Sequence, residues 1–146
     1  MKNILEKLIA KEYLTASEAE KSLIEITEGK HDDIIISSFL TIFMMRSVSI
    51  DELNGFRNAL LNLCVKIDLS DYDTIDLCGT GGDKKNTFNI STLSSFVTAG
   101  SGIKVAKHGN YGVSSNCGSS NVLEFLGINF SNNESFLKSC LDKAGI

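Results

Sequence analysis

The chain has 146 residues, of which 42% are hydrophobic and 22% charged, a globular composition that excludes a disordered tail or a fibrous repeat. Fourteen Lys and Arg against eighteen Asp and Glu give a net charge of −4, so a basic surface for nucleic acid is not expected. No apolar run approaches the roughly 20 residues of a membrane span, and charges interrupt the opening run from Met1 to Leu14, unlike a signal peptide. We therefore expect a cytoplasmic protein that binds neither nucleic acid nor membrane, long enough for a small domain plus part of another.

The first part of the chain, residues 1–70, is typical of helices. An apolar stripe at helical spacing begins at Ile4, and capping-box spacings follow at 15–18 and 49–52. Between them, the apolar segment 34–44 predicts a helix that is buried on most sides. We predict four short helices in a helical N-terminal domain, with enough apolar surface to pair two chains as a homodimer as well as to form a core.

Near Ser70 the hydrophobic period changes, and the order strand, loop, helix occurs three times. We predict strands over 74–78, 103–107 and 128–130. The helices that follow them are predicted over about 90–101, over 119–126, and after a capping box at 131–134. This order predicts an α/β fold class with a parallel sheet, in a partial α/β domain over residues 71–146. Because three strands are few for such a sheet, we expect the chain to be the N-terminal part of a longer protein.

Isolated cysteine, histidine and acidic residues give weaker signals. The four cysteines form no Cys-x-x-Cys pair, so we expect reduced thiols in or near the core rather than a zinc site. His31 is expected to be a surface residue beside a helix start. The adjacent Asp51 and Glu52 fall in the first turn of a predicted helix, where acids favour the dipole, and we do not interpret them as a metal site.

The glycine-rich segment 76–92 follows the first predicted strand and leads into a helix. Glycine lets backbone N–H groups approach an oxyanion, and a helix N-terminus adds unpaired N–H groups and the positive end of its dipole. Asn89, Ser91 and Thr92 offer capping and hydroxyl groups there. The spacing matches neither the dinucleotide fingerprint nor the P-loop. The segment therefore predicts an anion site of another kind, with a tight strand-to-helix turn as the alternative.

A second polar loop, 107–120, follows the second predicted strand. Loops after neighbouring parallel strands share one edge of a sheet, where open α/β sheets bind ligands. Lys107 offers a charge for phosphate, and His108 and Asn110 offer hydrogen bonds to a second substrate. Hydroxyl groups come from Ser114, Ser115 and Ser119. We expect the two loops to close on one ligand, although each of these residues taken singly also has a structural explanation.

The two loops together resemble anthranilate phosphoribosyltransferase. The resemblance is carried in order by Gly79-Thr-Gly-Gly-Asp83, Asn89-Ile-Ser-Thr92, Val105-Ala-Lys-His-Gly-Asn110, Gly118-Ser119, Val122-Leu-Glu124 and Leu126-Gly127. It implies a small helical domain before an α/β domain. It also implies an enzyme of tryptophan biosynthesis, in which the anthranilate amine attacks C1 of phosphoribosyl pyrophosphate and pyrophosphate leaves with Mg²⁺.

The resemblance also implies which residues bind each substrate, and it implies no nucleophilic side chain. Those for phosphoribosyl pyrophosphate are Gly79, Gly82, Asp83, Thr87, Asn89, Ile90, Ser91, Thr92, Lys107, Ser115 and Ser119. Ser91 would also contact magnesium. Anthranilate would be bound by Gly79, His108 and Asn110.

Three departures from the family bear on these implications. Tyr111 stands where the family usually has arginine, which removes a cation near the phosphates, and Ser120-Asn121 replaces the usual Ala-Asp. Family members are also much longer, and their remaining part holds an Asp-Glu pair for magnesium and an arginine for anthranilate. We therefore expect this chain alone to bind weakly and not to turn over.

Two other interpretations stay open. A pyrimidine nucleoside phosphorylase-like enzyme shares the fold and a glycine-loop phosphate site, although the Lys-His-Gly-Asn run at 107–110 argues against it. Alternatively, the chain is a non-catalytic dimerising fragment, in which the apolar helices pair two chains and the sheet is scaffold.

Overall fold

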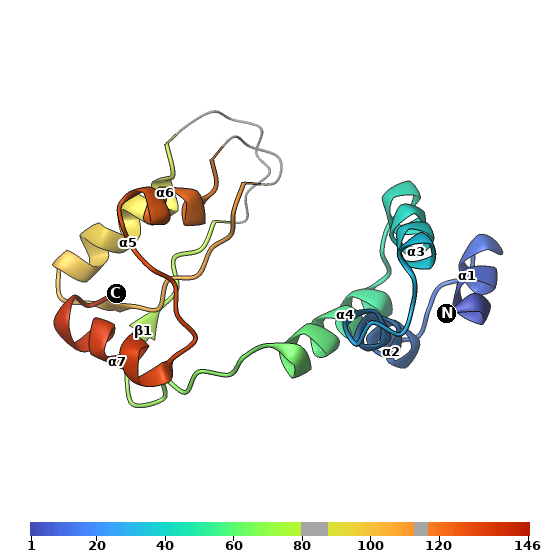
Figure 1. Ribbon diagram of the computed structural model, residues 1–146, viewed down its shortest axis with the longest axis horizontal. Coiled ribbons are helices and arrows are strands. Elements are labelled where there is room, and N and C mark those ends of the chain that lie inside the picture. The colour runs from blue at the N-terminus through green and yellow to red at the C-terminus, as the bar shows by residue number, and fades with distance from the viewer. Residues whose placement is uncertain (80–87, 113–116) are drawn as a thin grey trace. The chain divides into compact units, whose positions relative to one another are not determined.

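The computed structural model describes residues 1–79, 88–112 and 117–146, and the chain forms two compact units, Met1–Val65 and Lys66–Ile146. The first unit contains helices α1 (Lys2–Ile9), α2 (Ala16–Thr27), α3 (Asp33–Met45) and α4 (Ile50–Leu63). The second contains β1 (Thr74–Ile75), α5 (Ile90–Gly100), β2 (Lys104–Val105), α6 (Ser119–Phe125) and α7 (Glu134–Lys143) (Figure 1). The predicted fold class, helices followed by the beginning of a parallel α/β region, is confirmed.

Side-chain caps set the starts of the helices in the first unit. Thr15 Oγ1 accepts the N–H of Glu18 at 3.3 Å, and Glu18 Oε2 accepts the N–H of Thr15 at 2.8 Å. Ser49 and Glu52 make the same reciprocal pair at 3.2 and 2.8 Å, and Asp32 caps α3 through the N–H of Ile35 at 2.9 Å. Both predicted capping boxes are therefore confirmed, and each satisfies two N–H groups that the helix itself leaves unpaired.

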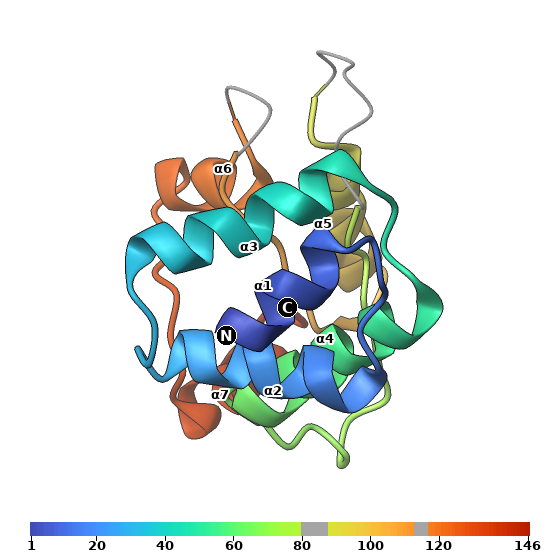
Figure 2. The same cartoon turned by 90° about the vertical axis from the view of Figure 1, so that its right-hand side faces the viewer.

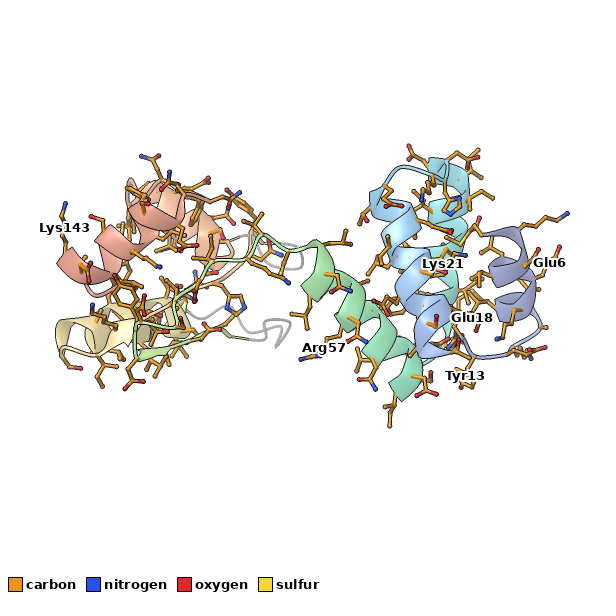
Figure 3. All side chains as sticks on the ribbon, turned by 90° about the horizontal axis from the view of Figure 1, so that it is seen from below. Glu6, Tyr13, Glu18, Lys21, Arg57 and Lys143 are labelled. Carbon is orange, nitrogen blue, oxygen red and sulfur yellow. The ribbon has the colours of Figure 1, made fainter. Side chains whose placement is uncertain are left out.

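A small apolar core joins the four helices of the first unit. Its buried residues are Leu8, Leu14, Ala19 and Phe39. The ring of Phe39 meets Phe43 edge-on at 4.9 Å between centroids. Figure 2 shows α1 between α2 and α3, and Figure 3 labels Glu18 near the start of α2. Gly55 of α4 lies so close to α2 that a Cβ there would overlap the carbonyl oxygen of Ala16, so this crossing requires the absence of a side chain.

The prediction that α3 is buried on most sides is wrong for the first unit. Only Phe39 of this helix is buried, whereas Ile34 is 78% and Met44 is 87% exposed. A bundle of four short helices covers one face of α3, because its neighbours pack on the side of Phe39, Ile42 and Phe43. The opposite face of α3 stays apolar and uncovered in this unit.

Glu52 forms a buried polar centre that the sequence pattern did not reveal. Its side chain is 0% exposed, and its carboxylate accepts hydrogen bonds from Arg46 at 2.5 and 3.0 Å. It also accepts the backbone N–H groups of Leu14 at 3.0 Å and Ser49 at 2.8 Å. The Arg46 guanidinium lies 4.8 Å from the centroid of the Tyr13 ring, a residue labelled in Figure 3. One carboxylate thus ties the loop after α1 to the turn before α4.

Opposing effects act on the pKa of Glu52. Burial alone raises the pKa, but the hydrogen bonds from Arg46 and from the backbone of Leu14 and Ser49 outweigh it and lower the pKa from 4.5 to about 2. The ionised form is therefore the one that the folded unit stabilises.

The described chain shows further differences from expectation. Cys64, Cys78 and Cys117 are exposed and Cys140 is half-buried, so the prediction of cysteines in or near the core is wrong for three of the four. His31 is also not a simple surface residue, because its side chain is only 17% exposed and its Nε2 lies 2.9 Å from Glu25. None of the helices in the described ranges is both long and apolar enough to span a membrane.

The second unit is built on two parallel strands. Thr74 pairs with Lys104 and Ile75 with Val105, and the N–H of Ala106 extends the pairing by donating to the carbonyl oxygen of Ile75 at 2.9 Å. Helix α5 connects the two strands and packs on β2. Figure 1 shows α5, α6 and α7 gathered around the strands. This is the predicted strand-helix-strand unit, with shorter strands than the sequence pattern indicated.

The predicted third strand over 128–130 is absent, and the capping box at 131–134 is wrong. Gly127, at φ +85°, ends α6, and the N–H of Ile128 donates back to the carbonyl oxygen of Leu123 at 3.0 Å. That hydrogen bond closes the helix end and uses a donor that a strand would need. Helix α7 begins two residues later than predicted, with Asn133 instead of Ser131 as the N-cap, and Asn133 accepts the N–H of Phe136 at 2.9 Å.

We predict that Glu52→Gln destabilises the first unit by about 3–5 kcal/mol, because it leaves the Arg46 guanidinium without its anion in a buried position. Denaturant unfolding of the purified chain, followed by circular dichroism, measures the change. The matched control is Asp51→Asn, one residue away in the same helical turn and exposed, which should change stability by less than about 1 kcal/mol.

A comparison of the native chain with Glu52→Gln over a range of pH tests the ionisation of Glu52. A carboxyl whose pKa falls on folding contributes stability above its unfolded pKa and loses it as pH falls through the folded pKa. The native chain should therefore lose part of its unfolding free energy between pH 4.5 and about 2, and Glu52→Gln should lack that part. Identical pH profiles for the two proteins would contradict this assignment.

Candidate functional site

The two polar loops leave the same edge of the strand pair. Both strands are parallel, and the segments 76–79 and 106–112 follow their carboxyl ends directly (Figure 1). This is the edge at which open α/β sheets bind ligands. The structure thus brings the described part of the glycine segment beside the loop that begins at Lys107.

Lys107 joins the two loops. Its Nζ donates to the carbonyl oxygen of Leu77 at 3.1 Å and to that of His108 at 2.9 Å. Among the described residues no carboxylate pairs with this ammonium, whereas the neighbouring Lys104 is paired with Asp142 at 3.0 Å. The half-buried Lys107 therefore places at the junction of the loops a positive charge that no described carboxylate balances, and such a charge attracts anions.

A second contact across the loops joins Asp76 to His108. Asp76 Oδ2 lies 2.6 Å from His108 Nδ1, and their side chains are 43% and 70% exposed. Asp76 follows β1 by one residue, and His108 follows β2 by three. Sequence reasoning selected His108 but missed Asp76. The available signal was an acidic residue directly after a strand that ends beside a histidine loop.

The loop after β2 is held close against the start of α6. The N–H of Asn110 donates to Ser119 Oγ at 3.2 Å, and the N–H of Ser120 donates to the carbonyl oxygen of Asn110 at 3.1 Å. A Cβ on Gly109 would overlap Ser119 Oγ, and a Cβ on Gly118 would overlap the backbone of Asn110 and Tyr111. These two glycines are therefore required by close approach, and they place Asn110 and Ser119 side by side.

Tyr111 and Asn121, two of the family departures, reinforce this arrangement. The phenol of Tyr111 donates to Glu124 Oε1 at 2.5 Å, and this hydrogen bond raises the pKa of Tyr111. The Tyr111 ring also meets Phe130 edge-on at 6.5 Å between centroids. Asn121 Oδ1 accepts the N–H groups of Gly112 at 3.0 Å and Gly118 at 2.9 Å. Because an aspartate oxygen would accept the same bonds, Asn121 keeps this part of the turn.

At the start of α5, Gly79 lies against the predicted binding residues. A Cβ on Gly79 would be 3.0 Å from Ser91 Oγ, so the chain at Gly79 lies directly against the first turn of the helix. Thr92 is buried, and its Oγ1 finds no partner among the described residues. Asn89 is the N-cap residue, but it makes no side-chain cap bond, so the capping role expected for it is wrong. Among the described residues, no side chain therefore caps α5 by accepting a hydrogen bond from the N–H groups of its first turn.

Several predicted site residues lie outside the described ranges. They are Gly82, Asp83, Thr87, Ser114 and Ser115. The binding roles predicted for them, and for the described site residues, stay predictions. In the described part of the chain, no group of three His, Cys, Asp or Glu side chains is arranged to hold a metal ion.

The fold and this loop edge define a class of protein: a helical bundle followed by a parallel α/β unit with two polar loops at its strand ends. Comparison with known families gives the same division. The model for the glycosyl transferase family, a/b domain, matches residues 71–146, and the helical bundle domain of the glycosyl transferase family matches residues 2–64. The chain belongs to this glycosyl transferase family.

The curated relatives of the chain carry a more specific name than the family. The chain is 67% identical to an anthranilate phosphoribosyltransferase of Flavobacterium johnsoniae and 47% identical to one of Bacteroides thetaiotaomicron. Each match covers 100% of this chain and 44% of the relative, so the chain spans less than half the length of these curated relatives. The resemblance identified from the two loops is confirmed.

A solved structure of the same kind of protein has a similar fold. The crystal structure of anthranilate phosphoribosyltransferase from Thermus thermophilus superposes with a TM-score of 0.79 at 28% identity. The match covers 97% of this chain and 43% of that one.

We predict that Gly109→Ala separates the Lys107 loop from α6, because the added Cβ would overlap Ser119 Oγ. Overpacking of this kind costs about 1–3 kcal/mol. Amide chemical shifts of Asn110 and Ser119 should move, and denaturant unfolding should show the loss of stability. The matched control is Gly100→Ala, where a Cβ meets nothing within 4 Å, and which should leave both measurements unchanged or raise stability slightly.

Proposed function

We propose that the protein containing this chain is an anthranilate phosphoribosyltransferase of tryptophan biosynthesis. It would transfer the phosphoribosyl group of phosphoribosyl pyrophosphate to the amine of anthranilate and release pyrophosphate. The observation that carries the proposal is the Lys107 ammonium, held by the carbonyl oxygens of Leu77 and His108 and paired with no described carboxylate. The names of the relatives support the substrates.

The diphosphate side of the proposed reaction calls for positive charge and hydrogen-bond donors. Lys107 supplies the charge, Ser91 and Ser119 supply hydroxyl groups, and the first turn of α5 supplies N–H groups and the positive end of its dipole. In such a transfer, the bond from C1 to the departing pyrophosphate breaks as charge develops on both fragments. Groups placed beforehand around the leaving oxygens lower that barrier without a nucleophilic side chain.

The described residues fit Mg²⁺ only in part. Ser91 Oγ is a hard oxygen ligand of the kind that the ion accepts, but no cluster of carboxylates accompanies it in the described ranges. Because Mg²⁺ usually keeps several waters and is held by one or two carboxylates together with substrate phosphates, Ser91 would be one ligand among others. When bound, the ion would neutralise charge on the diphosphate.

The anthranilate side is proposed to lie at Gly79, His108 and Asn110. Asn110 Oδ1 accepts the N–H of Tyr111 at 2.8 Å, which orients the carboxamide. Its Nδ2 has no partner among the described residues and is therefore a donor that an aromatic carboxylate would accept from. His108 offers a ring nitrogen nearby on the same loop.

The proposal also includes a homodimer formed through the N-terminal helices and a cytoplasmic location. Exposed apolar residues on α3 and α4 support the pairing: Ile34, Leu40, Met44, Met45, Leu53 and Leu60. Such side chains lose contact with water when two copies pack, which stabilises the pair by about 25 cal/mol per Å² of apolar surface. Cys64, Cys78 and Cys140 are unbridged thiols, as expected in a reducing compartment.

We predict that the full-length protein forms phosphoribosyl anthranilate from the two substrates, with activity lost on chelation of Mg²⁺. Lys107→Ala should raise the KM for phosphoribosyl pyrophosphate about tenfold or more, because a charge-assisted contact of about 1.5–3 kcal/mol is removed. Steady-state fluorescence assays with each substrate varied in turn measure both effects.

The matched control is Lys104→Ala, which removes a lysine three residues earlier whose charge is already paired with Asp142. Its KM for phosphoribosyl pyrophosphate should stay within about twofold of the native value, the range of an exposed pair. Activity with a pyrimidine nucleoside and phosphate instead of anthranilate would favour the phosphorylase alternative. No activity with either pair would leave the non-catalytic dimer.

We predict that the protein sediments as a dimer and that Met44→Glu in α3 shifts it toward the monomer, because a charge would be buried on pairing. Analytical ultracentrifugation measures the masses. Lys21→Glu serves as the control, because Lys21 is an exposed charged residue on α2, outside the proposed surface, and is labelled in Figure 3; this variant should stay dimeric.

A further inference from the structure

Two adjacent methionines lie on the outer side of α3. Met44 is 87% and Met45 is 82% exposed, whereas Ile42 and Phe43, directly before them, pack on the core of the first unit. The third methionine of the chain, Met1, also packs on that core. Two of the three thioethers are therefore presented to solvent at one place, the carboxyl end of α3.

A thioether can undergo a reaction that a hydrocarbon side chain of the same size cannot. Hydrogen peroxide transfers one oxygen atom to the sulfur, so that the O–O bond breaks, an S–O bond forms, the sulfur is oxidised by two electrons and water leaves. The product is a polar sulfoxide, which reductases return to the thioether. Because an oxidant must reach the sulfur, we expect Met44 and Met45 to react before Met1.

Both methionines belong to the apolar surface of α3 and α4 that is proposed above to pair two chains. A dimer formed about a twofold axis uses the same surface on both subunits, so each methionine would occur twice in the interface. Oxidation of both chains would place four sulfoxides there. A polar group that is buried without a hydrogen-bond partner destabilises the state that buries it, so the sulfoxides would favour the separated chains.

Pairing and oxidation would also compete with each other. The dimer would cover the thioethers, and peroxide would reach them in the separated chain. Because pairing depends on protein concentration, oxidation should slow as the concentration rises. Exposure alone, without pairing, gives a rate that is independent of protein concentration.

We propose that Met44 and Met45 form a reversible oxidation site, at which a peroxide converts the two thioethers to sulfoxides and shifts the protein from dimer to monomer. The shift rests on the homodimer of the proposed function. The reactivity of the two methionines does not, because it follows from their exposure.

The test uses the full-length protein, treated with dilute hydrogen peroxide and then with a thiol reductant. The reductant returns disulfides and sulfenic acids to thiols but leaves methionine sulfoxides. Mass spectrometry of peptides locates the added oxygen atoms, and analytical ultracentrifugation measures the dimer. We expect sulfoxides at Met44 and Met45 before Met1, and a Kd for the dimer that is about tenfold higher or more. Enzymes that reduce both sulfoxide epimers should restore the native Kd.

The matched control is the double variant Met44→Leu with Met45→Leu. It keeps apolar side chains of similar volume but has no sulfur at these positions. It should sediment as a dimer before and after peroxide, although it retains the same exposed cysteines. If this variant fails to fold, the concentration dependence of oxidation in the native protein and the rescue by the reductases still decide.

Three outcomes overturn the oxidation site: no preference for Met44 and Met45 over Met1, an unchanged dimer that carries both sulfoxides, or equal dissociation of the leucine variant by peroxide. An oxidation rate that does not fall with protein concentration would overturn the competition with pairing. A protein that is monomeric before peroxide is added would end the homodimer of the proposed function, and the shift with it. An unchanged oxidised dimer would leave that homodimer standing.

Discussion

The parallel pairing of β1 and β2 determines where everything at the candidate site begins. Only Thr74 and Ile75 pair with Lys104 and Val105. Because the two strands are parallel, the segments that follow them nevertheless leave the sheet at the same edge. The N–H of Ala106 then donates to Ile75, which carries the second loop one residue further alongside the first. Lys107 is consequently within reach of the carbonyl oxygen of Leu77, and His108 within reach of Asp76. A shift of one residue would send Lys107 to the other face of the strand and remove these contacts.

The main charged group of each unit has a different environment. In the first unit, the buried carboxylate of Glu52 is fully satisfied by Arg46 and two backbone N–H groups, so it organises the fold and has no capacity for a ligand. In the second unit, the Lys107 ammonium donates only to neutral carbonyl oxygens among the described residues. Those contacts hold the ammonium in place without cancelling its charge. Glu52 is therefore structural, whereas Lys107 keeps a charge that no described carboxylate balances.

The sequence predicted the features that depend on local rules. Helix starts at Thr15 and Ser49 follow from side chains that reach three residues ahead. The close approaches at Gly109 and Gly118 were not predicted, because they depend on how the loop packs against α6. Prediction from the sequence failed where a group is paired with a partner from another element of the fold. The N–H of Ile128 was assigned to a strand, but the end of α6 uses it, and the Arg46 partner of Glu52 and the Asp76 partner of His108 come from other turns or strands. Such pairings are decided by tertiary packing, which periodicity does not record.

Tyr111 shows how one substitution redistributes the roles at the site. An arginine at this position would place a second cation beside Lys107, but a phenol cannot carry positive charge. The phenol instead donates to Glu124 on α6, and its ring packs on Phe130, so the loop is fixed to the helix that follows it. The arginine charge is lost, but the attachment of Tyr111 to α6 helps to hold Asn110 against Ser119. In the function proposed above, affinity for a diphosphate would then depend more strongly on Lys107 and on the backbone N–H groups at the start of α5. Those N–H groups carry only partial charges and act within about one helical turn, so an ordered loop is a condition for binding as well as for the fold.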